Sequence, residues 1–214
     1  EFQLYIGIYE NLTAYNMKEQ GEEYLNKAFD IKGSSGENLA FRGKIYYLLG
    51  QYDNAEKELT AAIEKESKEA NLYLAQVYEA QGNMGQAETY YQAYTASGAA
   101  DSVAMNALAE IEIEKGNYVV ALDYVNQGLA MENVTNRAEL LSNKIVACEY
   151  SGNFATAWEA VQEYITLCPE DTAAQREYIF LKNRQMKEEP PEPETETEPQ
   201  ESTGQGETEQ PTQR

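Results

Sequence analysis

Gly50-Gln-Tyr-Asp-Asn-Ala55 is the stretch that decides the fold, because its pattern returns three more times along the chain. Each copy has a glycine, an amide side chain, a large apolar side chain, two variable residues and an alanine. The other copies begin at Gly82, Gly116 and Gly152, so the glycines are 32, 34 and 36 residues apart. A period in this range is typical of a repeat array, in which each unit is one small motif of secondary structure.

The residue types in the motif predict a helical hairpin. Glycine can adopt the left-handed backbone conformation that closes a helix. The Asn or Gln that follows suits a turn. The apolar residue covers the end of the hairpin, and the alanine falls early in the next helix, where two backbones approach closely. The repeating unit is therefore predicted to be a helix, a tight turn and a second helix.

Apolar residues at helical spacing extend this pattern to nearly the whole chain. Gly21 lies 34 residues before Ala55, where a repeat alanine is due, and so indicates a degenerate first repeat. Ser34-Ser-Gly-Glu37 resembles a capping box at the start of a helix. We expect an all-α fold of five hairpins and a closing helix, with helices near 2–15, 18–31, 36–49, 53–66, 68–81, 85–97, 102–115, 119–131, 136–151, 155–167 and 172–187.

The composition changes at Glu188. The last 27 residues contain nine Glu and five of the six Pro, and they have no aromatic or large aliphatic side chain. Such a segment cannot bury enough apolar surface to offset the entropy of ordering it. We therefore predict two parts, an α-solenoid domain over residues 1–187 and a disordered acidic tail over 188–214. The tail is interpreted either as a solubilising spacer or as a stalk that binds a partner.

Charge and composition argue against several classes of function. A net charge of −21 argues against binding of nucleic acid or of an anionic membrane surface. Histidine is absent, which removes the commonest general base and metal ligand. Cys148 and Cys168 are separated by a predicted helix, so we expect two free thiols with structural roles. No Gly-rich phosphate loop or nucleophile motif is present. We expect no catalytic site, no metal and no cofactor.

The hairpin unit resembles the tetratricopeptide repeat. Two segments match its pattern most fully, Leu39 to Ser67 and Leu141 to Pro169. The tryptophan usual in the first helix of a repeat is absent, and the proline that ends a repeat occurs only at Pro169. The resemblance covers about residues 2–187, and the repeats have a bacterial character. It implies a right-handed superhelix whose first helices line a concave face that binds a peptide or a partner's helix.

The resemblance also indicates which residues face this groove. Members of the family that bind chaperone tails use Lys, Arg and Asn to hold a C-terminal carboxylate, and only Lys44 and Asn106 are of that type here. We therefore expect a protein or peptide partner of basic or mixed apolar character, by charge complementarity. Three tyrosines that could reach the groove complete the set of expected contact residues: Glu10, Lys44, Tyr47, Tyr73, Gln76, Glu79, Asn106, Glu110, Ile113, Val146, Glu149 and Tyr150.

Three interpretations of function stay open at this point. The first is a non-catalytic scaffold for protein–protein interaction. The second, motivated by the absence of an initial Met and by the Glu/Thr/Pro/Gln-rich tail, is an envelope protein outside the cytoplasm whose N-terminal signal or anchor was removed. That location is slightly favoured over the cytoplasm. The third is an accessory domain of a larger protein whose other region carries the activity.

Overall fold

The computed structural model describes residues 1–188, with side chains as far as Gln185. Apart from its first residue, the predicted tail lies outside the described residues. Within the described part, all regular structure is helical, as the sequence predicts. Five hairpins and a final helix follow one another: α1 (Phe2–Ala14) and α2 (Lys18–Lys27), α3 (Gly36–Leu48) and α4 (Tyr52–Ile63), α5 (Glu69–Ala80) and α6 (Met84–Tyr94), α7 (Ser102–Glu114) and α8 (Tyr118–Leu129), α9 (Arg137–Tyr150) and α10 (Phe154–Leu167), then α11 (Thr172–Glu188).

The repeated turn has the same backbone geometry in all four copies. Its glycines have φ between 71° and 78°, in the left-handed region that a Cβ disfavours. In the first copy, the amide of Gly50 donates to the carbonyl of Tyr47 at 2.9 Å, and the amide of Gln51 donates to that of Tyr46 at 2.8 Å. This pair of bonds is the Schellman motif, which satisfies carbonyls at a helix end. In the second and fourth copies, Asn83 and Asn153 also cap the following helix through Oδ1.

The degenerate first repeat uses different residues for the same turn. Asn16 has φ 60° and takes the place of the glycine. The amide of Met17 donates to the carbonyl of Leu12 at 2.8 Å, the bond that Gln51 makes in the second hairpin. Gly21 is buried in α2, where an added Cβ would lie 2.9 Å from Cδ2 of Tyr9. The position of the repeat alanine is therefore so tight here that only glycine fits.

The core is a continuous row of small clusters between neighbouring helices. The motif alanines Ala55, Ala87, Ala121 and Ala157 are completely buried, and each lets two helices approach closely. Larger side chains, among them Leu59, Leu74, Leu108, Leu141 and Val161, fill the spaces beside them. At the C-terminal end, Leu181 of α11 is 1% exposed and packs into the last cluster, where Trp158 also contacts Tyr178. Each hairpin thus buries its apolar faces on its neighbours, as in a solenoid.

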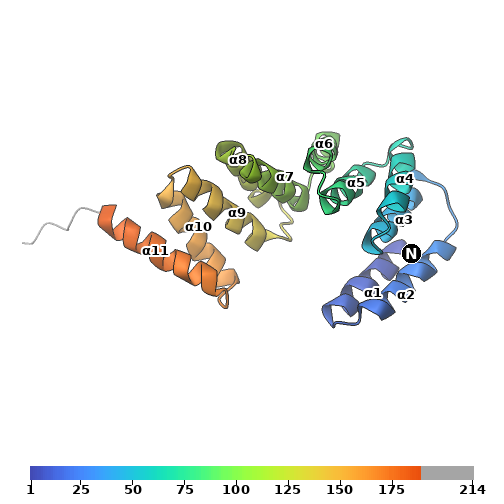
Figure 1. The fold of residues 1–214 in the computed structure, drawn as a ribbon, viewed down its shortest axis with the longest axis horizontal. Coiled ribbons are helices and arrows are strands. Elements are labelled where there is room, and N and C mark those ends of the chain that lie inside the picture. The colour runs from blue at the N-terminus through green and yellow to red at the C-terminus, as the bar shows by residue number, and fades with distance from the viewer. Residues whose placement is uncertain (189–214) are drawn as a thin grey trace, which may run out of the picture.

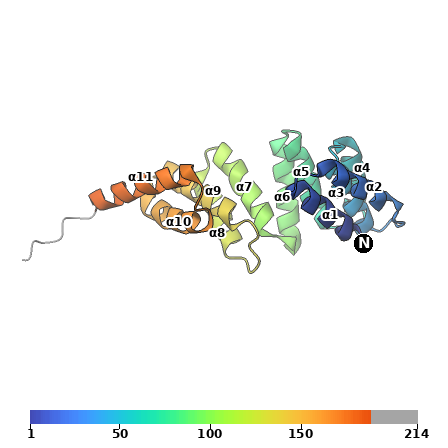
Figure 2. The same cartoon turned by 90° about the horizontal axis from the view of Figure 1, so that it is seen from below.

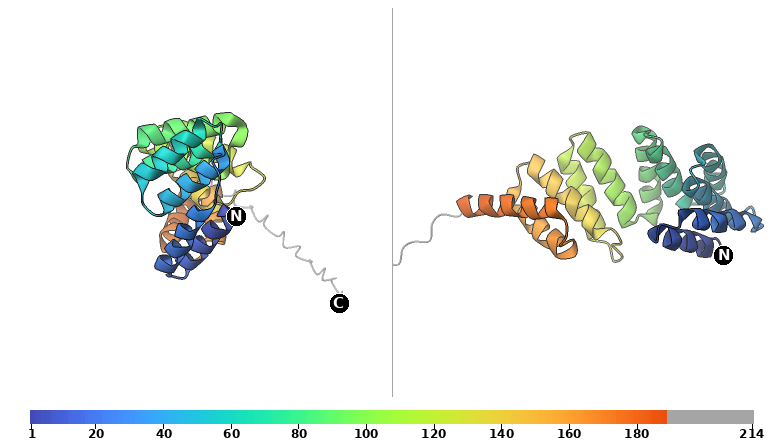
Figure 3. Two further views of the ribbon diagram at one scale, coloured as in Figure 1. Left: turned by 90° about the vertical axis from the view of Figure 1, so that its right-hand side faces the viewer. Right: turned by 60° about the horizontal axis from the view of Figure 1, so that its bottom comes forward.

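The hairpins form a curved row, and its two ends, α1–α2 and α10–α11, bend to the same side (Figure 1). The helices α5 and α7 lie on the inner side of this curve, and α6 and α8 lie on the outer side. The view from below shows the row as elongated (Figure 2), and the end-on view shows the stacked hairpins behind one another (Figure 3). Within the described residues, no helix is both long enough and apolar enough to cross a membrane.

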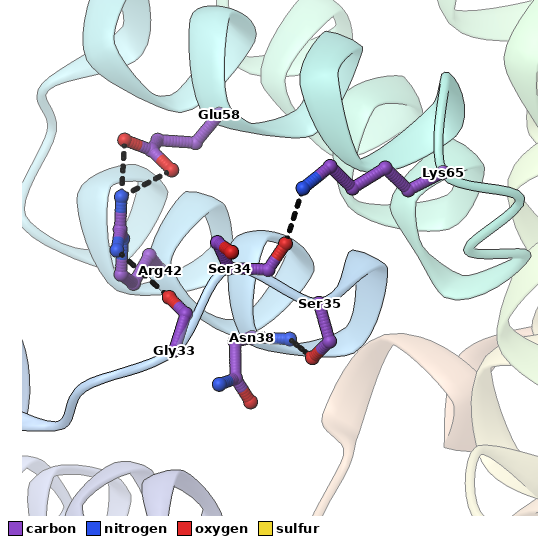
Figure 4. A network of polar contacts seen from close by, with 7 residues as sticks. All are labelled: Gly33, Ser34, Ser35, Asn38, Arg42, Glu58 and Lys65. Atoms are coloured by element: carbon purple, nitrogen blue, oxygen red, sulfur yellow. Dashed lines mark hydrogen bonds and ion pairs between the residues drawn. The ribbon is translucent and has the colours of Figure 1, made fainter.

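Polar contacts hold the loop between the first and second hairpins (Figure 4). Arg42 donates to both carboxylate oxygens of Glu58 at 2.9 Å, and it also reaches the carbonyl of Gly33 at 3.4 Å. The Lys65 ammonium donates to the carbonyl of Ser34. The helix cap is Ser35, whose hydroxyl accepts from the amide of Asn38 at 3.2 Å, so the predicted capping box is wrong by one residue.

The junction between the third and fourth hairpins differs from the others. Here α7 packs chiefly on α6, whereas at the two neighbouring junctions the first helices, α3 with α5 and α7 with α9, also pack together. Lys115 at the end of α7 bonds Glu88 of α6 at 2.7 Å and Glu112 at 2.9 Å. Glu112 is buried and also accepts from Asn117 at 2.8 Å. This ion pair network joins the two halves of the solenoid.

Candidate partner-binding groove

The expected contact residues of the first three hairpins meet around one lysine. Nζ of Lys44 on α3 lies 3.8 Å from Oε1 of Glu10 on α1, and 5.3 Å from the ring centre of Tyr73 on α5. Three successive first helices are thereby linked across the concave face. The charge of Lys44, the one cation among the expected contact residues, is already balanced by a carboxylate and an aromatic ring. It is therefore poorly placed to hold a partner's carboxylate.

Next along the face, a second group brings Tyr47 and Glu79 together. The hydroxyl of Tyr91, which belongs to the second helix α6, donates to Oε2 of Glu79. Burial raises the pKa of Tyr47, and the negative charge of Glu79 raises it further. Burial and the bond to Glu79 likewise raise the pKa of Tyr91. Both phenols therefore stay neutral at neutral pH.

The fourth and fifth hairpins contribute an amide–carboxylate network. Nδ2 of Asn106 donates to Oε1 of Glu110 at 2.8 Å. Asn143 on α9 donates to Oδ1 of Asn106 at 2.9 Å and to the same Glu110 oxygen at 3.2 Å. Asn106 is 8% exposed, whereas Glu110 is exposed. The two amides thus fix the position of a carboxylate that is exposed to solvent.

A pocket lies at the C-terminal end of the same face, between α9, α10 and α11. It has a volume of about 210 Å³. Two expected contact residues, Val146 and Glu149, line it together with Glu177 of α11. One oxygen of Glu149, Oε1, is buried and has no hydrogen-bond partner within the described residues. Burial first, and then the adjacent Glu177, raise the pKa of Glu149 to about 8.

A second hollow, of about 450 Å³, lies at the other end of the groove. Tyr73, an expected contact residue, lines it with Ala40 of α3, Gln3 of α1 and the α4–α5 loop. Burial and nearby carboxylates, first Glu69, raise the pKa of the Tyr73 phenol. Its wall also includes Lys65, so this hollow is of mixed charge.

The structure separates one expected contact residue from the rest. Tyr150 stacks on Tyr118, with ring centres 4.9 Å apart, at the turn end of the fourth and fifth hairpins. It is 70% exposed, but it lies outside the hollows described above. Gln76 and Ile113 are half-buried on α5 and α7. A role in binding is untested for all twelve residues and stays a prediction.

Sequence reasoning missed Tyr91, Asn143 and Glu177. Asn143 lies three residues before Val146, an expected contact residue, and so belongs to the same helical face. Glu177 was not considered because α11 was interpreted as a closing helix only, although it follows α10 as the first helix of a further repeat would. Tyr91 could not be inferred from its position, because it lies on a second helix and only its hydroxyl reaches Glu79.

The described side chains of the groove form no cluster suited to a metal ion. Among these residues, no group of three or more carboxylates and thiols could hold a metal ion. The two cysteines are free, and burial raises the pKa of the Cys148 thiol, so this thiol stays protonated. The groove presents carboxylates, amides and aromatic rings along its length.

Comparison with known proteins assigns the fold. Residues 42–102 match the family model of the tetratricopeptide repeat. Over these residues the chain matches the repeat that the motif predicts. A comparison with curated proteins finds no match.

Solved structures of tetratricopeptide repeat proteins superpose on most of this chain. One is a thermophilic protein of this class from Thermus thermophilus, with TM-score 0.61 and 14% identity, covering 86% of this chain and all of that one. Another is YrrB, described as having an unusual peptide-binding site, with TM-score 0.55 and 19% identity, covering 80% of this chain and 89% of that one. The Cut9–Hcn1 hetero-tetramer of the APC/C superposes with TM-score 0.66 at 16% identity, over 87% of this chain. This chain spans 37% of the length of that one. At these identities the likeness establishes the fold, an α-solenoid.

Proposed function

We propose that this protein is a non-catalytic scaffold that binds a peptide or a protein segment of basic or mixed apolar character along its concave face. The proposal rests on which charged side chains of the groove have a partner of opposite charge and which do not. Lys44 is balanced by Glu10 and Tyr73, whereas the exposed carboxylate of Glu110 is held by two amides and has no cationic partner within the described residues. A negative groove attracts a positive partner and repels an acidic one.

Aromatic and apolar side chains beside these carboxylates support a mixed partner. Tyr47, Tyr73, Ile113 and Val146 are each half-buried along the first helices. Tyrosine is favoured at interfaces because it is large, fairly rigid and amphipathic. We infer that rings and aliphatic groups supply contact area, and that the carboxylates select charge and orientation.

Peptide selection on the full chain tests the proposal. A displayed random peptide library is selected against the purified protein, and the binders are measured against Tyr47→Ala and Glu110→Gln variants. The control is Glu159→Gln, an exposed glutamate of α10 that lies beside Arg137 and Lys144 rather than in the groove. Binders enriched in Lys, Arg and apolar residues, with affinity lowered about tenfold by either groove substitution, would support the proposal.

Two results would contradict it. Binders that are predominantly acidic would overturn the expected charge preference. Binders with equal affinity for the groove variants and the control would place the interaction elsewhere on the molecule. Thermal unfolding of each variant separates loss of binding from loss of structure.

The other two interpretations stay predictions. Neither an extracytoplasmic, anchored role in envelope assembly or surface presentation nor a role as accessory domain is favoured by a particular contact in residues 1–188. Both are compatible with a groove that binds a partner.

A further inference from the structure

The pocket between α9, α10 and α11 has features that the remainder of the groove lacks. Two carboxyl side chains, from Glu149 and Glu177, meet in a hollow whose walls are largely apolar or small: Ile145, Val146, Val161, Ala173 and Ala174. A carboxylate oxygen that is buried without a hydrogen-bond partner costs free energy, on the order of 1–3 kcal/mol or more for a charged group. Oε1 of Glu149 is buried and has no donor within the described residues when the side chain is ionised, so the ionised form is disfavoured.

Glu177 can hydrogen-bond Glu149 only while one of the two carboxyl groups is protonated, and no cationic group within the described residues reaches this oxygen. The Asp171 carboxylate accepts from the amides of Ala173 and Ala174 at 2.9 and 3.1 Å and from the hydroxyl of Tyr164 at 2.9 Å. It caps α11 and orients Tyr164, and as an acceptor it cannot donate to Oε1 of Glu149. Arg176 is exposed on α11 and is not part of the pocket lining.

We propose that this pocket binds the side chain of a Lys or Arg residue in the partner's segment, with the cationic group held between Glu149 and Glu177 and the aliphatic stem against Val146 and Val161. The inference rests on the proposed function, since it names the residue of the partner that the C-terminal end of the groove selects.

The size and the walls of the pocket fit such a side chain. Water occupies about 30 Å³ per molecule in the liquid, so a hollow of about 210 Å³ can take one long side chain in place of several waters. Lys and Arg bury their aliphatic stems against apolar surface while the charged group remains with polar partners. The charged group would supply the donors that the ionised form of Glu149 lacks.

Charge also decides between possible occupants. A second copy of this chain carries a net charge of −21, and residues 188–214 contain nine Glu and a single Arg. Both would bring negative charge to a negative pocket. A basic segment of another protein is the occupant that complements it.

Proton linkage supports the same occupant. The pKa of Glu149 near 8 means that the pocket holds a proton at neutral pH. A bound cation favours the ionised carboxylate and releases this proton. Binding should therefore tighten as the pH rises from 6 to about 8.5, and the Glu149→Gln variant should lose this dependence. The charged and titratable groups that face Glu149 are Glu177 and Asp171 of the α11 segment and Tyr164 of α10.

The experiment is a double-mutant cycle with the selected peptides. In each binder, Lys is replaced by norleucine or Arg by citrulline, which keeps the shape and removes the charge. Affinities are measured against the natural protein and against the Glu149→Gln/Glu177→Gln protein. We expect one basic residue whose replacement weakens binding to the natural protein about tenfold and has little effect on the double variant.

The outcomes separate the two proposals. If binders respond to Tyr47→Ala and Glu110→Gln but no basic residue couples to Glu149 and Glu177, the groove function stands and the pocket assignment is wrong. If binders respond to none of the groove substitutions, the proposed function itself is wrong. Because Gln keeps the size of Glu and removes a like-charge contact, we expect the double variant to fold, and thermal unfolding checks this.

Discussion

At the scale of single residues, glycines have two different roles in this solenoid. Gly50 and its equivalents supply a backbone conformation, and an added Cβ at Gly50 would meet nothing within 4 Å. Gly43 supplies space, because a Cβ at this position would lie 2.4 Å from Cγ of Leu59 on the partner helix. Gly7, in contrast, lies in a helix with no neighbour within 4 Å of an added Cβ.

This difference predicts opposite effects of one substitution. We expect Gly43→Ala to lower the free energy of unfolding by about 1–3 kcal/mol, because it overpacks the contact with Leu59. Gly7→Ala should raise it by about 0.5–1 kcal/mol, because alanine is the better helix former and meets no neighbour. Urea unfolding followed by circular dichroism measures both. Equal effects of the two substitutions would show that helix propensity, not packing, dominates at Gly43.

Glu149 predicts a dependence of stability on pH. Its pKa of about 8 in the folded protein lies above the ordinary value of 4.5. Between these values the folded state holds a proton that the unfolded state has lost, so stability falls as the pH rises and levels off above pH 8. Above pH 8, Glu149→Gln should therefore be more stable than the natural protein by about 1–2 kcal/mol. This is less than the full shift implies, because water screens a pocket open to solvent.

Thermal unfolding between pH 5 and pH 9 measures this effect. The gain from Glu149→Gln should shrink as the pH falls towards 5, where the natural side chain is protonated in the folded state. Glu159→Gln, on an exposed surface of α10, serves as the control and should leave the pH profile unchanged. A Glu149→Gln profile parallel to that of the natural protein would contradict the raised pKa.

At the scale of helices, the turn motif allowed most of the fold to be predicted. A glycine with φ near 75° ends a helix whatever lies around it, so the helix ends at Gly50, Gly82, Gly116 and Gly152 follow from local backbone physics. The end of one other helix was predicted less accurately. The helix expected over 85–97 ends at Tyr94 and passes into a wider turn, Thr95–Ala99, which contains Gly98.

The groove was predictable only in part, for a related reason. Helical periodicity places Glu110 and Glu149 on the concave face, because a face repeats within each first helix. It does not say which side chains from different helices meet. The stacking of Tyr150 on Tyr118, the bond from Tyr91 to Glu79 and the approach of Glu177 to Glu149 all depend on how adjacent hairpins are stacked.

At the scale of the whole molecule, each hairpin is stabilised only by its neighbours. The last cluster of buried residues includes Leu181, Val161 and Cys148 and extends over α9, α10 and α11. The first cluster is built on Phe2, Ile6 and Leu25 and is separate from it. A disturbance at one end should therefore remain largely local.

Leu181→Ala tests this expectation. Leu181 is 1% exposed, so its truncation should cost the C-terminal end about 2–5 kcal/mol. In hydrogen exchange measured by mass spectrometry, we expect faster exchange in α9–α11 and unchanged exchange in α1–α4, because no contact between these parts depends on Leu181. The matched control is Leu25→Ala, which should reverse the pattern, since Leu25 is fully buried in the first cluster. Faster exchange throughout the chain in either variant would show instead that the solenoid unfolds as one cooperative unit.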